Sequence, residues 1–447
     1  MASCLPLIKA GWAGKKFLKI YKYLLLYFPH IIILNKLKII AYNICHTIFL
    51  FLLVVMSDTF VKAEEVRLNI FRIQEIEQLK VAISNPTTKM QGYIYFLQQA
   101  TESLLKLGPW SVTDCQCPLA HIDPHDYYSE STYWWPDPKN PEASYIRKDG
   151  VRNPDRFLKH KNALNMLCHS TLILSAAAYL FDNQQYAERA KEFIRVWFID
   201  PETRMNPNAK YAQVIPNSDK RRGVGILDTR RFVFLLEGVG LLKQAGFWDI
   251  GLETELQNWF SEYLDWLLNS YYGQDERRRG NNHSSWYAVQ IAAYANYTDN
   301  QEVNSETWKY IRNTLLEKQI NKDGKMPLEL ERTRSLNYFL FNLEAWSLLN
   351  RMAEKDGIDF WQLENSHGGS LAKSLDFILP YLENPEDWQL AQITIFRLRE
   401  QMFLLFSAEA LDKPHMIELY QSVMSPEIIK DDTFLFILNM MVIARVF

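Results

Sequence analysis

Residues 163–181 have the sequence ALNMLCHSTLILSAAAYLF, in which apolar side chains recur at i, i+3 and i+4. This spacing places the apolar side chains on one face of an α-helix. The same spacing recurs in residues 229–245, 255–272, 284–297, 335–353 and 388–411, whereas strand-like alternation is scarce. Short polar, glycine or proline breaks separate the segments, which predicts antiparallel neighbours. The sequence therefore predicts an all-α fold.

Two long segments lack helical periodicity. Residues 109–157 hold seven of the 18 prolines and a run of aromatic side chains, and residues 200–228 are also irregular. Long irregular segments inside a compact domain are usually functional. Many helices with long loops gathered at one end predict an incomplete (α/α) toroid, or barrel of antiparallel helix pairs, with a cleft at the loop end. No fixed repeat period is visible, so a solenoid is not indicated.

The first 63 residues differ in composition from the rest. Lys36 and Lys38 precede the apolar run IIAYNICHTIFLFLLVVM (39–56), and VKA closes the segment. This order is typical of an export signal cleaved after Ala63. It predicts a periplasmic or secreted protein in which residues 64–447 form one domain without stable membrane association. The alternative is an uncleaved N-terminal anchor, because the apolar run approaches the length of a membrane span.

Charge and cysteine content exclude several classes of partner. The first 63 residues hold eight lysines and one aspartate, so the formal net charge of −3 becomes −10 for residues 64–447. Without a basic field, a nucleic-acid partner is not expected. Cys115, Cys117 and Cys168 give no disulfide framework, and Cys115-x-Cys117 lacks partner ligands at zinc spacing. The sequence therefore predicts no metal and no cofactor.

The segment GNNHSSWYAVQ (280–290) opens a predicted helix with several hydrogen-bonding groups. Asn281 or Asn282 suits the N-cap position, which is the structural explanation. Helical spacing also gives one stripe of amide and indole groups beside an imidazole and a phenol: Asn282, Trp286 and Gln290, then His283 and Tyr287. Such a stripe is unusual for a core and predicts a wall along a polar ligand.

The segment PLELERTRSLNYFLFNLEAW (327–346) brings together arginine and tyrosine. Arg334 and Tyr338 are four residues apart, so on a helix they share a face. Arg332 lies beside Arg334, and two like charges are favourable where an anion lies between them. The alternative is a surface pair with Glu329 and Glu331.

These groups favour a particular reaction. A glycosidase needs two carboxyl groups that flank the scissile bond. The C5 proton of a uronate lies next to a carboxylate, and asparagine and arginine can neutralise that carboxylate while the proton leaves. A histidine or tyrosine takes the proton, and a tyrosine protonates the departing O4. Tyr338 alone could perform both transfers on a mannuronate or glucuronate, whereas His283 could supply the base for a guluronate.

The sequence also resembles the alginate-lyase-domain polysaccharide lyases, over roughly residues 110–385. The resemblance rests on five motifs in order: HDYYSESTYWWPDP (125–138), YIRKDGVRNPD (145–155), RRGVGILDTR (221–230), NNHSSWYAVQ (281–290) and PLELERTRSLNY (327–338). It implies an (α/α) toroid that cleaves uronate polymers by β-elimination without an obligatory metal. Because the first motif matches a branch that includes glucuronan lyases, it implies either polymannuronate-type alginate or glucuronan as substrate.

The resemblance also implies site residues. Asn282 and His283 fall on the family's Asn-His pair and Tyr338 on its catalytic tyrosine. Arg334, or alternatively Arg332, falls on its carboxylate-binding arginine. We therefore expect Asn282, His283, Arg334 and Tyr338 to be catalytic. The residues expected to bind the acidic polysaccharide are His125, Tyr128, Tyr133, Trp134, Trp135, Arg222, Trp286, Tyr287 and Arg332.

Three alternatives remain open at this point. The aromatic side chains of residues 125–138 could pack a loop onto the body rather than stack on sugar rings. A glycoside hydrolase on the same toroid would use carboxylates such as Asp126, Asp228 and Glu329. A noncatalytic protein that binds acidic glycans would keep the aromatic and arginine side chains but would not need Tyr338.

Overall fold

The computed structural model describes residues 66, 68–119, 121–396, 398, 401–423, 437, 439–441 and 444. The chain divides into two units, Met1–Glu65 and Val66–Phe447. The predicted leader, residues 1–63, lies outside the described residues and stays a prediction.

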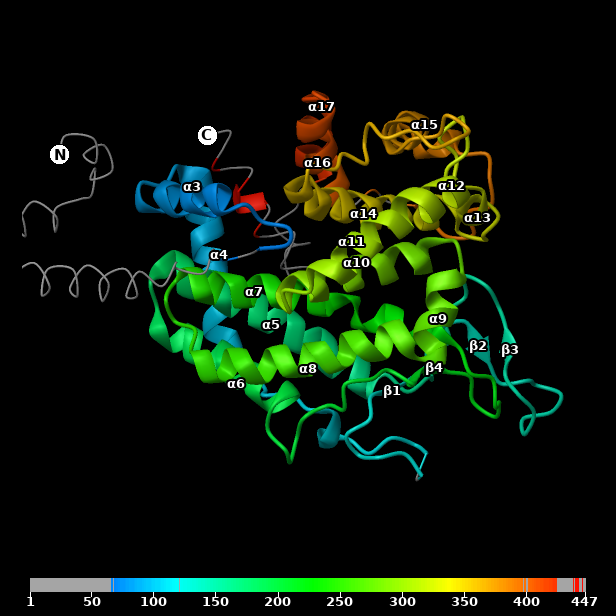
Figure 1. Ribbon diagram of the computed structural model, residues 1–447, viewed down its shortest axis with the longest axis horizontal. Helices are drawn as coiled ribbons and strands as arrows, with labels where there is room; N and C mark the ends of the chain where they lie inside the picture. The colour runs from blue at the N-terminus through cyan, green and yellow to red at the C-terminus, as the bar shows by residue number, and fades with distance from the viewer. Residues whose placement is uncertain are drawn as a thin grey trace, which may run out of the picture. The chain divides into compact units, whose positions relative to one another are not determined.

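Helices make up most of the described chain (Figure 1). The α-helices are α3 (Ile73–Ser84), α4 (Thr88–Leu104), α5 (Lys159–Phe181), α6 (Gln184–Phe198), α7 (Phe232–Gln244), α8 (Ile250–Asn269), α9 (Tyr271–Arg278), α10 (Asn282–Tyr297), α11 (Gln301–Tyr310), α12 (Leu316–Gln319), α13 (Pro327–Leu330), α14 (Ser335–Ala353), α15 (Leu371–Glu383), α16 (Met402–Ala410) and α17 (His415–Val423). A 3₁₀ segment, η3 (Gly223–Arg231), precedes α7, and a π-helical turn (Ile311–Leu315) follows α11.

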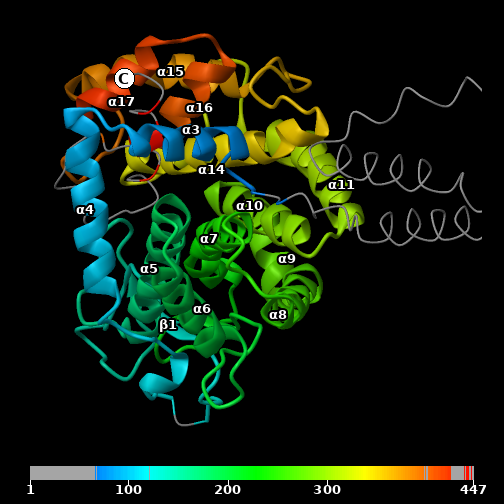
Figure 2. The ribbon, with the colours of Figure 1, turned by 90° about the vertical axis from the view of Figure 1, so that its left-hand side faces the viewer.

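The helices form an inner and an outer row. The inner helices α5, α7, α10 and α14 contact one another in that order, whereas α6, α8 and α11 lie outside them and contact α5, α10 or each other. Figure 2 shows the same helices from the side, with α14 and α3 next to α10 and α7. The inner helices α5, α7 and α10 are joined to the outer helices α6, α8 and α11 by short connections, as expected for antiparallel pairs. This is the predicted all-α arrangement of an incomplete (α/α) toroid.

The helix α5 forms the centre of the core. Every side chain from Ser170 to Leu180 is buried, because the apolar spacing of this segment is met by α6 on one side and α7 on the other. By length and hydropathy, α5 is the one described helix that could cross a membrane. However, 78% of its most apolar window is buried within the protein, so it serves as a core helix.

The predicted helix at 388–411 is only partly correct. Helix α16 covers its C-terminal part, but the described residues between Trp388 and Gln401 are not helical. Their backbone pairs with the start of α14 instead: the Ala391 carbonyl accepts from the Ser335 N–H at 2.9 Å, and the Ile393 N–H donates to the Thr333 carbonyl at 2.9 Å. These long-range bonds compete with helix formation, and local apolar spacing does not reveal them.

Short strands lie together at the right-hand end of the body in Figure 1. They form two two-stranded sheets in the described chain, both within the segments predicted to be irregular. In one, β1 (Tyr128–Glu130) pairs in parallel with β4 (Tyr211–Val214). In the other, β2 (Trp134–Trp135) pairs antiparallel with β3 (Ile146–Arg147) and forms a hairpin.

Asp228 in η3 ties these loops to the helices. Its carboxylate accepts from Lys161 Nζ at 2.6 Å, Ser129 Oγ at 2.7 Å, Gln213 Nε2 at 2.9 Å and the Tyr127 hydroxyl at 3.2 Å. Burial raises the pKa of this carboxyl, but the Lys161 charge and the hydrogen bonds outweigh burial and hold the pKa below its usual value. The loop end is therefore fixed around one ionised, buried carboxylate.

Candidate active site

The corner between α9 and α10 presents Asn282 and His283. Gly280 has φ +73°, a left-handed conformation that glycine adopts without strain, and it separates the two helices. Asn281 caps α10, because its side chain accepts from the His283 backbone N–H at 3.2 Å. The predicted cap is therefore Asn281, which leaves the Asn282 side chain for another contact.

Asn282 is held by a buried glutamate from α13. Its backbone N–H and its Nδ2 donate to the two carboxylate oxygens of Glu329 at 2.6 and 2.7 Å, and each residue is only 1% exposed. Burial raises the pKa of Glu329, although the two Asn282 hydrogen bonds oppose the rise. The proposed surface pairing of Glu329 with an arginine is wrong, because the carboxylate faces inward. The two bonds fix the orientation of the Asn282 amide.

His283 is held by a second buried glutamate. Its Nδ1 lies 2.6 Å from Oε1 of Glu276, whose side chain is 1% exposed. The other carboxylate oxygen of Glu276 lies 3.1 Å from Nε of Arg279. Arg279 also pairs with Asp275, which accepts from the Gly223 N–H at 2.7 Å. The imidazole thus lies against an acid–base cluster at the end of α9.

Tyr338, in the first turn of α14, contacts the loop segment and an arginine. Its hydroxyl donates to the Tyr133 hydroxyl at 2.8 Å, and the guanidinium of Arg332 lies 3.8 Å from the centroid of its ring. Asp149 holds Arg332 through Nε at 3.2 Å and through a terminal nitrogen at 2.8 Å. Burial raises the pKa of Tyr338, Tyr133 adds to the rise and Arg332 opposes it. Tyr338 is therefore a neutral phenol at rest.

In the described contacts, the Arg334 side chain bonds to Thr394 and Asn337 rather than to the phenol. It occupies the N-cap of α14 with φ −127° and ψ 56°, so it is outside the helix, and its four-residue spacing to Tyr338 does not place the two on one face. Its Nε donates to Thr394 Oγ1 at 3.1 Å, and its backbone forms a bridge with Gln392. The structure brings Arg332 onto Tyr338 and directs Arg334 elsewhere.

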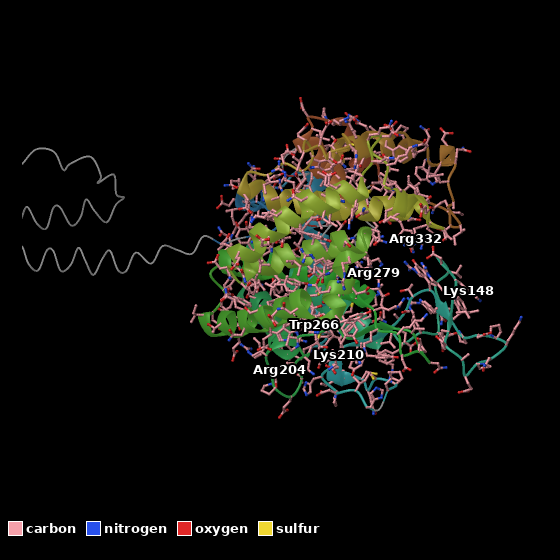
Figure 3. All side chains as sticks on the ribbon, turned by 45° about the vertical axis from the view of Figure 1, so that its right-hand side comes forward. Lys148, Arg204, Lys210, Trp266, Arg279 and Arg332 are labelled. Atoms are coloured by element: carbon pink, nitrogen blue, oxygen red, sulfur yellow. The ribbon has the colours of Figure 1, made fainter. Side chains whose placement is uncertain are left out.

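The hairpin carries two half-buried indoles, each covered by a cation. The guanidinium of Arg222 lies 5.4 Å from the Trp134 ring, and Lys148 Nζ lies 4.7 Å from the Trp135 ring. Burial and the positive charges of two neighbouring arginines lower the pKa of Arg222 to about 10. Figure 3 shows Lys148 just after β3, across from Arg279, which follows α9, and from Arg332, which lies between α13 and α14.

The stripe predicted to line a ligand lies in the core instead. Trp286 and Tyr287 are 3% and 2% exposed, and they donate to backbone carbonyls of α14 and α8 at 3.1 and 3.0 Å. Gln290 is fully buried and accepts from Thr229 Oγ1 at 2.8 Å. This packing does not support the predicted contact of Trp286 and Tyr287 with substrate, which stays a prediction. Helical spacing tells which side chains share a face, but it does not tell whether that face meets a ligand or a neighbouring helix.

Two residues of the aromatic motif also lie away from these groups. Tyr128 is 1% exposed, and its hydroxyl donates to Glu130 at 3.1 Å, which does not support its predicted contact with substrate. His125 is half-buried, and its Nδ1 lies 2.7 Å from the Arg204 carbonyl oxygen. Arg204 lies well apart from Arg279 and Arg332 in Figure 3. Elsewhere in the motif, Tyr133 contacts Tyr338, Trp134 contacts Arg222, and Trp135 follows Trp134 in β2.

A closed ring of contacts joins the groups that do come together. Each neighbouring pair is adjacent in the chain, hydrogen-bonded, or in cation–π contact. In order around this contact ring, the residues are Tyr338, Tyr133, Trp134, Arg222, Gly223, Asp275, Glu276, His283, Asn282, Glu329 and Arg332. We call the members from Asp275 to Tyr338 the helical side, and the hairpin residues Tyr133 and Trp134, with Trp135 and Asp149, the hairpin side.

Sequence reasoning missed several members of this assembly, among them Glu276 and Asp149. Glu276 lies seven residues before His283, but the Gly280 corner intervenes, so helical spacing does not predict their contact. Asp149 meets Arg332 across 183 positions of the chain, in the motif YIRKDGVRNPD. The sequence analysis used that motif only as part of the family resemblance and did not single out the aspartate.

The carboxylates that a hydrolase would use are committed to other contacts. Asp126 is 2% exposed and pairs with Lys210 at 2.9 Å. Asp228 is bound by Lys161, and Glu329 by Asn282. A glycosidase needs an acid and a base that face the bond from both sides. Of the three candidates, none is available for that role.

An (α/α) toroid with an amide, an imidazole, a phenol and arginines at its loop end has the architecture and chemistry of a polysaccharide lyase. The chain matches the model of the alginate lyase family over residues 118–388. The crystal structure of an alginate lyase from Bacteroides ovatus is similar, with 30% sequence identity and a TM-score of 0.74, over 79% of this chain and 95% of that one.

An alginate lyase of a Sphingomonas species has 15% identity and a TM-score of 0.46, over 71% of this chain and 84% of that one. Curated proteins give no match. The family match covers more than half of the chain, and the Bacteroides structure supports it. The chain therefore belongs to the alginate lyase family and is a polysaccharide lyase, a carbon–oxygen lyase that acts on polysaccharides.

Proposed function

We propose that this lyase cleaves a uronate polymer, either polymannuronate-type alginate or glucuronan, by β-elimination and leaves 4,5-unsaturated products. The contact ring is the observation that supports this substrate class. It gathers groups from four distant segments of the chain and includes hydrogen-bond donors and arginines suited to a carboxylate. The similar Bacteroides protein is described as an alginate lyase.

Tyr338 is the proposed acid, and also the base where the C5 proton and O4 lie on one face of the sugar. Where Tyr338 is the acid alone, its resting phenol gives its own proton to the departing O4. Where Tyr338 is also the base, it acts as the phenolate that its neighbour Arg332 favours, takes the C5 proton and returns that proton to O4. The electron pair of the C5–H bond becomes the C4=C5 double bond, and the C4–O4 pair leaves with the oxygen.

Asn282 and His283 act on the carboxylate side of the reaction. Asn282 donates one Nδ2 hydrogen to Glu329, and an amide nitrogen has a second hydrogen to offer. That donor would stabilise the charge that builds on the C5 carboxylate as the proton leaves. His283, on the next residue of the helix start, either takes the C5 proton or binds the carboxylate.

Arg332 is the proposed arginine of the site. Burial disfavours its charge, but the bond to Asp149 and the neighbouring phenol raise its pKa above the usual value. It therefore stays charged while it lies over Tyr338. Arg334, bound to Thr394, is left with a structural contact at the start of α14.

We also propose that the protein is exported to the periplasm or secreted. The basic, then apolar order of the first 63 residues supports export. An acidic polysaccharide outside the cytoplasm is a substrate consistent with that location. Mass spectrometry of the protein recovered from its native host would show a mature N-terminus after Ala63, and an intact Met1 in the membrane fraction would favour an anchor.

To test the proposed elimination, the purified protein is incubated separately with polymannuronate, polyguluronate, glucuronan and glycosaminoglycans. The ultraviolet absorbance of each mixture is followed over time. We expect absorbance to rise on polymannuronate or glucuronan, because elimination creates a conjugated double bond. Tyr338→Phe should lower kcat by about 100- to 10,000-fold, the range for one acid–base group.

Tyr310→Phe is the matched control, since this half-buried phenol donates to a backbone carbonyl outside the contact ring. It should keep activity. New reducing ends without absorbance would overturn elimination in favour of hydrolysis. Binding without any product would favour a noncatalytic glycan-binding protein.

A further inference from the structure

A cavity of about 290 Å³ lies against the corner between α9 and α10. Its walls are the last turn of α9, Gly280 and the segment that runs from the end of α11 to α12. Its volume is close to the lower end of the range for small-molecule sites, roughly 300–1,000 Å³. None of its lining residues belongs to the contact ring, so the cavity is distinct from the candidate active site.

Cations line this cavity, which we call the cationic cavity. Arg277 and Arg278 reach it from α9 and Lys318 reaches it from α12, and no acidic residue is among its lining residues. Within the described part of the chain, no ion pair includes any of these three cations. Residues 64–447 carry a formal net charge of −10, so overall composition does not account for a cluster of cations without an acid.

Helix ends account for only part of this arrangement. Arg277 and Arg278 lie in the last turn of α9 and Lys318 in the last turn of α12, where a cation interacts favourably with the helix dipole. That interaction would hold for a cation that points in any direction from the helix end. The two helix ends instead direct their cations to one cavity, where like charges repel one another unless an anion lies among them. An anion is therefore the ligand that the cationic cavity fits.

Arg277 is held in a position suited to a carboxylate. Its guanidinium lies 4.4 Å from the centroid of the Tyr310 ring, and its backbone carbonyl accepts from Ser284 Oγ at 2.9 Å. A guanidinium held by its flat face keeps its N–H edge for a planar, two-pronged contact with a carboxylate. The Tyr310 hydroxyl donates to the same backbone carbonyl, so it is the ring of Tyr310 that supports the cation. The cavity therefore offers one positioned guanidinium beside two exposed cations.

The cationic cavity borders the corner that carries Asn282. Gly280 lines the cavity and lies two residues before Asn282 in the chain. In the described structure, a Cβ on Gly280 would have one neighbour within 4 Å, Leu328 Cδ1 at 3.9 Å, so the backbone is nearly open there. Figure 3 shows Arg279, the residue before Gly280, at the same end of the helical body as Arg332. The cavity is therefore a neighbour of the Asn-His corner, with a residue that lacks a side chain between them.

We propose that the cationic cavity is a subsite that binds a carboxylate of the substrate polymer away from the cleaved bond. The inference rests on the proposed function, in which the substrate is a uronate polymer. Every unit of such a polymer carries a carboxylate, so a chain with one unit at Asn282 has further carboxylates on its neighbouring units. Arg277 binds one of them through its N–H edge, and Arg278 and Lys318 neutralise its charge. The subsite increases the affinity for long chains and takes no part in proton transfer.

The double variant Arg278→Gln/Lys318→Gln is the main test, because both side chains are exposed and the packed Arg277 stays in place. We expect KM for the preferred polymer to rise by about tenfold, the effect of losing one charge-assisted contact, while kcat changes by less than about twofold. The shortest oligosaccharide that is cleaved should have the same KM in wild type and variant, because it does not reach the cavity. An equal rise in KM for the shortest and the longest chains would overturn the proposal.

The double variant Lys309→Gln/Arg312→Gln is the matched control. It also removes one lysine and one arginine from the segment between the start of α11 and the end of α12, but these two side chains line another cavity. KM for the polymer should stay within about twofold of wild type at the same ionic strength, because exposed charges away from the ligand contribute little. An equal rise in KM in the two double variants would mean that overall charge sets the affinity, and the proposal would fail.

Calorimetry separates this inference from the proposed function. Tyr338→Phe, which should bind but not cleave, is titrated with long oligosaccharides of mannuronate or glucuronate, alone and combined with Arg278→Gln/Lys318→Gln. We expect the added substitutions to raise Kd about tenfold. An unchanged Kd would overturn the subsite whether or not wild type cleaves the polymer. Binding that depends on Arg278 and Lys318 in a protein that cleaves no polymer would support the subsite and count against the proposed elimination.

Discussion

The two sides of the contact ring are built differently. On the helical side, Asn282 and His283 are each held by a glutamate that is 1% exposed. On the hairpin side, half-buried indoles lie under cations, and Asp149 links the hairpin to the helices. Hydrogen bonds to buried charges fix orientation, whereas exposed cation–π contacts contribute little energy and adjust easily. The difference suggests that the helical side determines kcat and the hairpin side determines KM.

Asn282→Asp should have the largest effect. It places a second carboxylate against buried Glu329, and two buried carboxylates at this distance cannot both ionise. The variant loses the amide donor, so kcat/KM should fall by about 100- to 1,000-fold, as for loss of one oxyanion-stabilising donor. Steady-state kinetics on the preferred polymer would measure it.

Asn281→Asp is the control for that change. Aspartate caps a helix as well as asparagine does, and Asn281 contacts the His283 backbone rather than Glu329. It should retain most of the activity. A similar loss in both variants would mean that any added negative charge at the start of α10 is harmful, and the special role of the Asn282–Glu329 contact would be lost.

Replacing Arg332 or Arg334 with lysine should give unequal results. Lysine cannot reproduce the two-pronged contact with Asp149, so Arg332→Lys should lose about 1.5–3 kcal/mol, a roughly 10- to 100-fold drop in kcat/KM. Arg334→Lys should stay within about threefold, since exposed contacts are worth under about 1 kcal/mol. The reverse order would restore Arg334 as the arginine of the site.

Arg332 and Arg334 show which part of the site the sequence could not predict. The toroid follows from apolar spacing, and α14 begins and ends as predicted, at 335 and 353. Spacing assumes a helix, however, and Arg334 lies one residue before it, where the chain is not helical. Which arginine faces Tyr338 depends on Asp149 of a distant loop, a contact that no local pattern contains.

The Asn-His corner also shows that local sequence patterns do not reveal long-range contacts. Residue types at 281–283 predict polar chemistry, and the structure finds the cap and the paired groups there. The buried partners of that corner come from α9 and α13, and the sequence offered Glu329 only as a surface partner of the arginines or as a hydrolase carboxylate. Likewise, Gln290 looked suited to a ligand but meets Thr229 in the core. Motifs identify reactive groups, whereas the groups that orient them emerge only from packing.

Asp149→Asn should loosen the link between the two sides. Asp149 binds Arg332 and accepts from Thr333 Oγ1 at 2.9 Å, so the variant should raise KM about tenfold, for a loss of about 1.5 kcal/mol, with a smaller change in kcat. Asp137→Asn is the matched control, because in the described contacts the Asp137 carboxylate accepts only from the Lys139 N–H, within the hairpin segment. An equal rise in KM in both variants would mean that the Asp149–Arg332 contact is not what sets KM.

The same aspartate sets a pH dependence. Burial raises the pKa of Asp149, but its bonds to Arg332 and Thr333 outweigh burial and hold the folded-state pKa below the ordinary value of 3.8. A depressed carboxyl pKa contributes stability that is complete above the unfolded-state pKa and is lost as pH falls through the folded-state pKa. The thermal stabilities of wild type and Asp149→Asn should therefore differ by a constant amount above about pH 5, and the difference should begin to shrink only as pH falls below about 3.8 towards the folded-state pKa. A difference that grows toward low pH would contradict this assignment.

The smallest effects should come from the two indoles. Trp134 contacts Arg222 of the body, whereas the cation over Trp135 is Lys148 of the same hairpin. Trp134→Ala should raise KM by up to about tenfold and Trp135→Ala by about threefold, because one exposed cation–π contact is worth about 0.5–1 kcal/mol and Trp134 also helps to place Arg222. In both variants kcat should hardly change, since neither indole contacts the buried glutamates in the described structure. A fall in kcat with constant KM would place the hairpin in the chemistry itself and would end the division between the two sides.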